Sequence, residues 1–319
     1  MENASQINST NGTESGFLER FLLHQTSEGR IALGVLGLEI LLIISTNTLV
    51  FLLVARYKEL RRKSNYCLIS LAMSDVLAGL VSLPLVIACS TTSHVSICTT
   101  MDLCQRFLSI STIFHLVVAT GERYVKIRNP LKYKYVATSS RILGVLVLVW
   151  LFSLFVSLIQ LAWIDLPDSR SYDLTFTIVC LTLLAFLPFA AIVGGYGHMI
   201  YIIKQESIAR SLMMSQGGKP RKGMRRRENE RKVLLVYLGM ALSFALGWFP
   251  YFIITLLQDL GRVKQLTFWT SIFLLSLKFT TALVNPLLYT FFKADFQKAV
   301  RGFVRGDDLK PRTKTLSKV

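Results

Sequence analysis

The chain has 319 residues, of which 52% are hydrophobic and only 17% are charged. Soluble globular domains carry about 25% charged residues, so this composition argues against ordinary soluble domains. The net charge of +17 would suit a nucleic-acid-binding protein, but the basic residues lie between long apolar segments, and we expect no nucleic-acid partner.

Seven apolar segments follow one another along the chain, each near the roughly 20 residues that a helix needs to cross the hydrocarbon layer. Strand-like alternation is absent, and lipid admits only helices and closed barrels, so we expect an all-α bundle of transmembrane helices. The expected spans are residues 31–55, 64–89, 98–126, 142–164, 174–203, 232–257 and 266–292. The expected organisation is an outer segment at 1–28, the bundle at 29–292, an interfacial helix at 293–304 and a tail at 305–319.

Orientation follows from the positive charge. Most of the 36 Lys and Arg residues lie in segments that alternate spans place on one side, namely 56–63, 123–141, 204–232 and 293–318. By the positive-inside rule, this side is cytoplasmic and the N-terminus lies outside, as in a multi-pass protein of the plasma membrane. Three N-glycosylation sequons at Asn3, Asn8 and Asn11 agree with that orientation and predict a glycoprotein.

Each span carries a distinctive residue or motif. In chain order these are Asn47, Leu71-Ala72-Met73-Ser74-Asp75, Glu122-Arg123-Tyr124, Trp150, Pro188 with Tyr196, Gly247-Trp248-Phe249-Pro250, and Asn285-Pro286-Leu287-Leu288-Tyr289. This series resembles the rhodopsin-like (class A) G-protein-coupled receptors over all seven spans. One departure is Gly247, which stands where the family usually has cysteine.

The resemblance implies a receptor that binds an extracellular ligand within the bundle and activates a heterotrimeric G protein as the sixth helix moves outward. The residues implied in coupling and switching are Glu122, Arg123, Tyr124, Pro130, Leu131, Tyr196, Glu230, Asn285, Pro286 and Tyr289, and the connector beneath the ligand is Ile113, Pro188 and Phe244. An Arg123–Glu230 ion pair is expected to hold the third and sixth helices together at rest. Proline removes a helix hydrogen bond, so Pro250 and Pro286 are expected to kink their helices.

Asp75 is a carboxylate in mid-membrane, which is costly and marks a functional site. The resemblance implies a regulatory sodium ion held by Asp75, Thr112, Trp248, Thr281 and Asn285. The alternative is a protonated or hydrogen-bonded Asp75 without an ion, and Ala282 replaces a serine that the family often has there. No other cofactor is expected.

Five cysteines lie at positions 67, 89, 98, 104 and 180. Cys98 matches the family's third-helix cysteine, but the loop at 165–173 holds no cysteine to pair with it. Cys89 is expected on the same outer side and could pair with Cys98 or with Cys104, and Cys98 could also have another partner. The absence of the usual bridge is a partial similarity to melanocortin and cannabinoid receptors.

The resemblance also maps the ligand pocket. Its expected lining is Asp102, Gln105, Arg106, Ser109, Cys180, Leu184, Trp248, Tyr251, Phe252, Thr255, Leu275 and Lys278. Monoamine receptors have an aspartate where this chain has Gln105, so classical biogenic amines are not expected. Adenosine receptors have an asparagine where Thr255 lies, which argues against adenosine.

Lys278 is a cation in the seventh span and needs a partner. Three alternatives stay open: a structural pair with Glu39, an anionic small molecule or lipid bound by Lys278 and Arg106, and a Schiff base with retinal as in opsins. Against retinal, Lys278 lies eight residues before Pro286 where opsins have seven, and Met101 occupies the usual counter-ion position.

After the seventh span, Phe292, Phe296, Val300 and Phe303 recur at helical spacing among basic residues. This pattern predicts an amphipathic helix on the inner leaflet, with membrane lipid as a partner. The terminal Ser317-Lys318-Val319 resembles a PDZ-domain ligand.

The sequence argues against two other classes of protein. A transporter would be expected to show internal repeats, which are absent here. The four histidines, His24, His94, His115 and His198, form no HExxH motif, so we expect neither an enzyme nor catalytic residues.

Overall fold

The computed structural model describes residues 26–215, 223–264 and 266–306. The sequons at Asn3, Asn8 and Asn11 and the terminal Ser317–Val319 lie outside the described residues, as do most of the expected outer segment and tail. The α-helices are α2 (Ser27–Arg56), α3 (Tyr66–Leu77), α4 (Leu83–Thr92), α5 (Val95–Arg128), α6 (Pro130–Val136), α7 (Ser139–Leu158), α8 (Ser169–Val179), α9 (Leu187–Ser215), α10 (Gly223–Asp259), α11 (Phe268–Phe292) and α12 (Ala294–Arg305).

Within the described part of the chain, seven helical segments are long and apolar enough to cross a membrane. Two of them are composite: a π-helical turn at Ala78–Ser82 joins α3 to α4, and another at Cys180–Phe186 joins α8 to α9. Short 3-10 helices (Lys58–Leu60, Lys63–Asn65 and Ile159–Ala162) connect or extend the spans. The seven-helix fold predicted from the sequence is confirmed.

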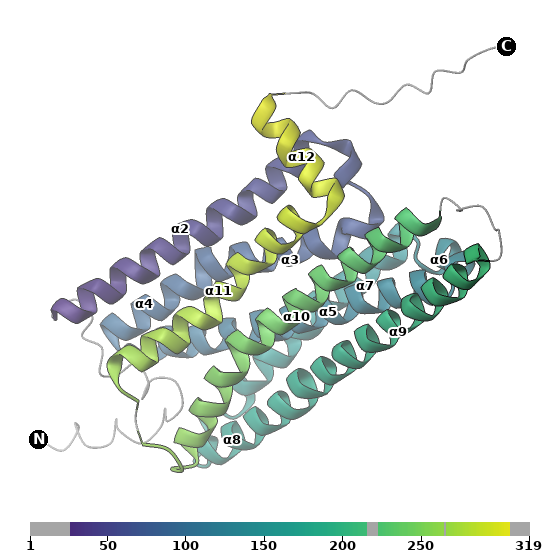
Figure 1. The fold of residues 1–319 in the computed structure, drawn as a ribbon. Helices are drawn as coiled ribbons and strands as arrows, with labels where there is room; N and C mark the ends of the chain where they lie inside the picture. The colour runs from purple at the N-terminus through teal and green to yellow at the C-terminus, as the bar shows by residue number, and fades with distance from the viewer. Residues whose placement is uncertain (1–25, 216–222, 265, 307–319) are drawn as a thin grey trace, which may run out of the picture.

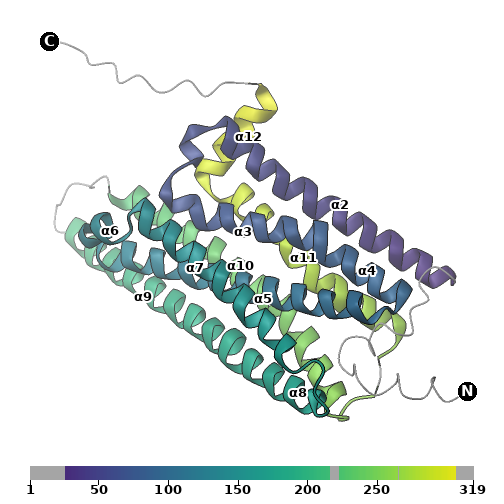
Figure 2. The same cartoon turned by 180° about the vertical axis from the view of Figure 1, so that it is seen from behind.

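The long helices run side by side as one elongated bundle (Figure 1). α2 packs on α3 and α11, while α9 lies on the other flank, against α5 and α10. The same bundle seen from behind shows α6 at the same end as α12 (Figure 2). We call this end of the molecule the α12 end.

Several helices begin where a threonine caps them. The side chain of Thr26 accepts the Gly29 N–H at 3.0 Å, and Thr138 and Thr267 do the same for Arg141 and Thr270 at 3.4 Å. A capping hydroxyl satisfies a backbone donor that the first helical turn leaves free. These capped first turns are polar, so hydropathy does not detect them. The α7 helix, for example, begins at Ser139, three residues before the expected start of its span at residue 142.

The bundle has an apolar exterior and a partly polar interior. Leu148, Phe155 and Leu246 are each more than 60% exposed, as expected for side chains that face lipid. Asp75, Lys278 and other charged residues are buried inside. This distribution is the reverse of that in a soluble domain, because lipid solvates the apolar surface and the interior must pair the polar groups.

α12 turns away from the bundle axis at Lys293 (Figures 1 and 2). Phe296 and Ala299 are buried against the bundle, and the Phe296 ring lies 4.9 Å from that of Tyr289. Phe303 and Val304 remain exposed on the far part of the helix. The short amphipathic helix predicted after the seventh span is confirmed.

Candidate ligand cavity and switch

A cavity opens between α5, the composite α8–α9 span and α10. It holds about 810 Å³ of empty space, part of it open to solvent. The wall is mostly apolar, with polar and charged side chains from α5, α8, α10 and the 3-10 helix at Ile159–Ala162. Lining it are Asp102, Gln105, Arg106, Ser109, Ile110, Ile113, Gln160, Thr177, Cys180, Leu181, Leu184, Ala185, Phe244, Phe252, Thr255 and Asp259.

The charged groups of the cavity are two carboxylates and one guanidinium. Asp102 and Arg106 project from α5 one turn apart, and Asp259 ends α10. The guanidinium carbon of Arg106 lies 4.8 Å from the centre of the Phe176 ring. Its Nε is buried and has no hydrogen-bond partner. A buried guanidinium N–H without an acceptor is unfavourable, so this N–H is available to donate a hydrogen bond to a ligand.

The floor of the cavity is aromatic. Phe244 and Ile113 are almost fully buried and line it from α10 and α5. The Phe244 ring stacks on Trp248 at 5.9 Å between centroids and meets Phe249 edge-on at 6.0 Å. A ligand that presses on this floor therefore acts directly on the middle of α10. Pro188, the third residue of the expected connector, lies one residue into α9, just beyond the π-helical turn.

Lys278 lies beside the cavity and is fully buried, but it is not among the lining residues. Its ammonium donates to Gln105 Oε1 and lies 3.6 Å from the centre of the Tyr251 ring. Glu39, one of the expected partners, instead accepts a hydrogen bond from Thr280 at 3.1 Å. The Lys278 ammonium therefore contacts α5 and α10, whereas Glu39 contacts Thr280 of α11.

The cavity overlaps the expected lining only in part. Eight expected residues line it: Asp102, Gln105, Arg106, Ser109, Cys180, Leu184, Phe252 and Thr255. The other four expected residues, Trp248, Tyr251, Leu275 and Lys278, are buried but do not line it. Gln160, Thr177 and Asp259 also line the cavity and were missed, because they belong to no motif that predicts the direction of their side chains.

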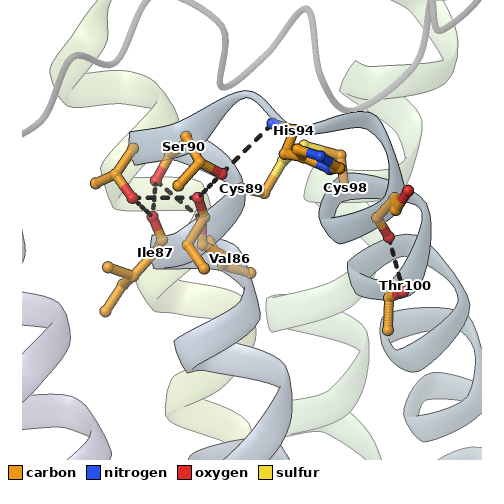
Figure 3. Close-up of a disulfide and its surroundings, with 11 residues drawn as sticks. Val86, Ile87, Cys89, Ser90, His94, Cys98 and Thr100 are labelled. Atoms are coloured by element: carbon orange, nitrogen blue, oxygen red, sulfur yellow. Dashed lines mark hydrogen bonds between the residues drawn. A yellow bond between two sulfur atoms is a disulfide. The ribbon is translucent and has the colours of Figure 1, made fainter.

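The end of the bundle opposite α12 is held by a disulfide between Cys89 and Cys98. The two Cα atoms are 4.9 Å apart, and the bridge closes the short turn from α4 to α5 (Figure 3). Of the two partners that the sequence left open for Cys89, the structure has Cys98, and Cys104 remains a thiol. A second anchor lies after α7, where Trp163 Nε1 donates to Asp173 at 2.7 Å.

The residues of the expected sodium site are all buried in the interior of the bundle. Asn285 Nδ2 donates to Asp75 Oδ2 at 3.1 Å, and Trp248 Nε1 donates to Thr281 Oγ1 at 3.3 Å. Thr112 is buried on α5. Carboxylate, amide and hydroxyl oxygens are the donor set that a hard cation prefers, so the residues present fit such an ion.

At the α12 end, Arg123 is buried and joins three parts of the bundle. Its Nη2 donates to the Tyr237 hydroxyl of α10 at 3.2 Å and to the Ser64 carbonyl at 3.1 Å. The guanidinium also lies 5.1 Å from the centre of the Tyr237 ring. Tyr237 was not among the expected switch residues, since a tyrosine in an apolar span reads as core.

The expected ion pair between Arg123 and Glu230 is wrong. Glu230 Oε1 instead pairs with Lys126 Nζ at 2.9 Å, one turn further along α5. Arg123 points inward and donates to Tyr237. A hydrogen bond from a charged donor is stronger than one between neutral groups, and this one is buried. The link between α5 and α10 is therefore present, but Lys126 supplies its cation.

The remaining switch residues are placed around this link. Tyr133 of α6 donates to Glu122 Oε1 at 2.6 Å; burial and the hydrogen bond to the carboxylate raise the pKa of the Tyr133 phenol. Tyr124 contacts His198 at 3.1 Å, and Thr120 donates to Tyr196 at 3.2 Å. Asn285, Pro286 and Tyr289 lie on the buried side of α11, whereas Leu131 of α6 is 85% exposed and Pro130 is also exposed.

A bundle of seven membrane-spanning helices, with an arginine and a carboxylate at the end of the third span and an amphipathic helix after the seventh, is the architecture of a G-protein-coupled receptor. The family model of the 7 transmembrane receptor (rhodopsin family) matches residues 46–289. The chain belongs to this family, as its motifs predicted, and is a signalling receptor rather than an enzyme.

Curated relatives match over most of their length. The chain is 25% identical over 307 residues to trace amine-associated receptor 7d of Mus musculus, covering 89% of this chain and 85% of the relative. It is 25% identical over 288 residues to the histamine H2 receptor of Canis lupus familiaris, covering 85% and 78%. It is 26% identical over 311 residues to the 5-hydroxytryptamine receptor 4 of Cavia porcellus, covering 84% and 78%.

Proposed function

We propose that this receptor recognises a small zwitterionic molecule, with an ammonium group and a carboxylate or similar anion, in the cavity between α5, α8–α9 and α10. Binding on the aromatic floor would shift the bundle to a state in which α10 moves outward at the α12 end and a heterotrimeric G protein is activated. We place that end in the cytoplasm of a plasma-membrane protein with its N-terminus outside, because the basic residues gather there.

The observation that carries the anionic half of the proposal is Arg106. Its Nε is buried beside the cavity without a hydrogen-bond partner, and Phe176 holds the guanidinium from one face. A carboxylate would supply the missing acceptor, and Arg binds carboxylates with charge-assisted hydrogen bonds. Lys278, which the sequence offered as a second anion ligand, is turned away from the cavity and is left out of this proposal.

The cationic half rests on the carboxylates that line the same cavity. Asp102 and Asp259 make it net acidic despite Arg106. The relatives are named for a trace amine, histamine and 5-hydroxytryptamine, which supports an ammonium group in the ligand. Gln105 has no charge, so the counter-ion of the ammonium would be Asp102, one turn away from the position that monoamine receptors use.

A matched ligand series tests both halves. Phenylalanine, phenethylamine and N-acetylphenylalanine share a ring that suits the apolar wall. Phenethylamine lacks the carboxylate, and acetylation removes the ammonium charge of the third compound. We expect phenylalanine to promote the most nucleotide exchange on purified G protein in membranes that contain the receptor. Arg106→Gln should remove the preference for phenylalanine over phenethylamine, and Asp102→Asn the preference over the N-acetylated acid. Thr177→Ala, which alters a neutral lining residue, is the control. A preference that survives both changes would contradict the proposal.

Two expectations from the family remain proposals at neighbouring sites. We propose that sodium, bound at Asp75 with Thr112, Trp248, Thr281 and Asn285, favours the resting state. Raising sodium at constant ionic strength should lower basal exchange, and Asp75→Asn should abolish that effect. A retinal Schiff base at Lys278 is the alternative ligand chemistry, and visible absorbance after addition of retinal would support it.

A further inference from the structure

Lys278 is fully buried, and its ammonium contacts aromatic rings and one side-chain oxygen. The nitrogen lies 3.6 Å from the centre of the Tyr251 ring and 5.3 Å from the centres of the Trp248 and Phe279 rings. The carbonyl oxygen of Gln105 accepts its hydrogen bond. Aromatic faces and a neutral oxygen are the groups with which proteins recognise ammonium ligands.

The path of the backbone explains how the lysine reaches this position. A methyl group added at Gly247 would lie 2.5 Å from Thr281 Cγ2 and 2.8 Å from the Leu277 carbonyl oxygen. Only glycine therefore lets α10 and α11 approach this closely. The approach brings the Lys278 stem beside Trp248 and Tyr251, the two α10 residues that face it.

We propose that Lys278 is an internal ligand, whose ammonium fills an ammonium site formed by Gln105, Tyr251, Trp248 and Phe279. The filled site ties α11 to α5 and α10 and sets the resting position of Trp248, above the floor of the cavity. When the side chain is shortened, the same site takes a small alkylammonium ion from solution. This inference depends on neither the zwitterionic ligand nor the G protein proposed above.

The vacated space has a defined shape and a route to solvent. Lys278→Ala removes three methylene groups and the ammonium, which together correspond to n-propylammonium. Gln105 borders both the ammonium site and the cavity, as does Phe252, whose ring lies 5.4 Å from that of Trp248. A small cation can therefore reach the site through the cavity.

The experiment follows the unfolding temperature of the purified receptor. Lys278→Ala should unfold at a lower temperature than the wild type. n-Propylammonium should raise that temperature by about 3 °C at ten times its dissociation constant, and further with the logarithm of its concentration. The wild type and Lys278→Met should not respond, because a side chain fills the site in both. Adding Gln105→Leu to Lys278→Ala should weaken the response by removing the acceptor.

Neutral 1-propanol separates charge recognition from cavity filling. A rise with 1-propanol equal to that with n-propylammonium would overturn the proposal, as would an equal rise in the wild type or Lys278→Met. Should Lys278→Ala fail to accumulate, its yield in membranes is measured with each compound in the growth medium, and only n-propylammonium should increase it. Equal yields would overturn the proposal as well.

Discussion

The Lys126–Glu230 ion pair offers the sharpest test of the switch. It joins α5 to α10 at 2.9 Å, with side chains that are 23% and 16% exposed. An ion pair at this level of exposure contributes about 0.5–1 kcal/mol. If the pair forms only at rest, Glu230→Gln should shift the balance towards the active state by about two- to fivefold.

The assay is nucleotide exchange on purified G protein without ligand. Lys126→Gln should raise the basal rate as much as Glu230→Gln, and the double variant no further, because both remove one interaction. Arg128→Gln, at an exposed basic residue on the same helix end, is the control for net charge. A basal rate that rises with Glu230→Gln but not with Lys126→Gln would refute the reasoning and restore Arg123 as the partner.

Three further predictions concern stability. Gly247→Ala should lower the free energy of unfolding by about 1–3 kcal/mol, because the new methyl group meets backbone of α11; Gly239→Ala, which meets only a leucine methyl group at 3.3 Å, should change the unfolding temperature much less. Cys89→Ser should lower the free energy of unfolding by about 2–3 kcal/mol, because the disulfide no longer closes its short loop in the unfolded chain. A reductant should lower the unfolding temperature of the wild type but not of this variant. Burial lowers the pKa of Lys293 from 10.5 to about 8. Between these pH values the unfolded chain binds more protons at Lys293 than the folded protein does. The free energy of unfolding should therefore rise as pH rises from about 8 to 10.5. Thermal unfolding should show that rise in the wild type and not in Lys293→Gln.

The fold could be predicted because its determinants are local. A run of apolar residues as long as the hydrocarbon layer specifies a span, and spacing alone specifies α12. The expected lining of the cavity was placed best on α5, where one helical face carries Asp102, Gln105, Arg106 and Ser109. Residues three and four apart share a face in any helix, so their common direction does not depend on packing.

The sequence could not decide contacts that depend on the relative positions of helices. Arg123 and Lys126 are three residues apart on α5, and either could face Glu230 until the distance to α10 is known. The choice depends on Tyr237, whose hydroxyl lies within an apolar span. It accepts a hydrogen bond from Arg123 further inside the bundle, which leaves Glu230 to Lys126. The pairing of Cys89 was open for the same reason, because the distance and direction between the side chains decide between Cys98 and Cys104.

The chain's departures from the family pattern are easier to understand together than one at a time. Gly247 in place of cysteine allows a close approach, Lys278 uses that approach to place an ammonium on Tyr251, and Gln105 supplies the neutral acceptor. An aspartate in place of Gln105 would form a buried ion pair, whose desolvation offsets much of its attraction. A neutral glutamine holds the cation without adding a second buried charge. A glutamine at position 105, where monoamine receptors have an aspartate, therefore suits a buried lysine across the bundle.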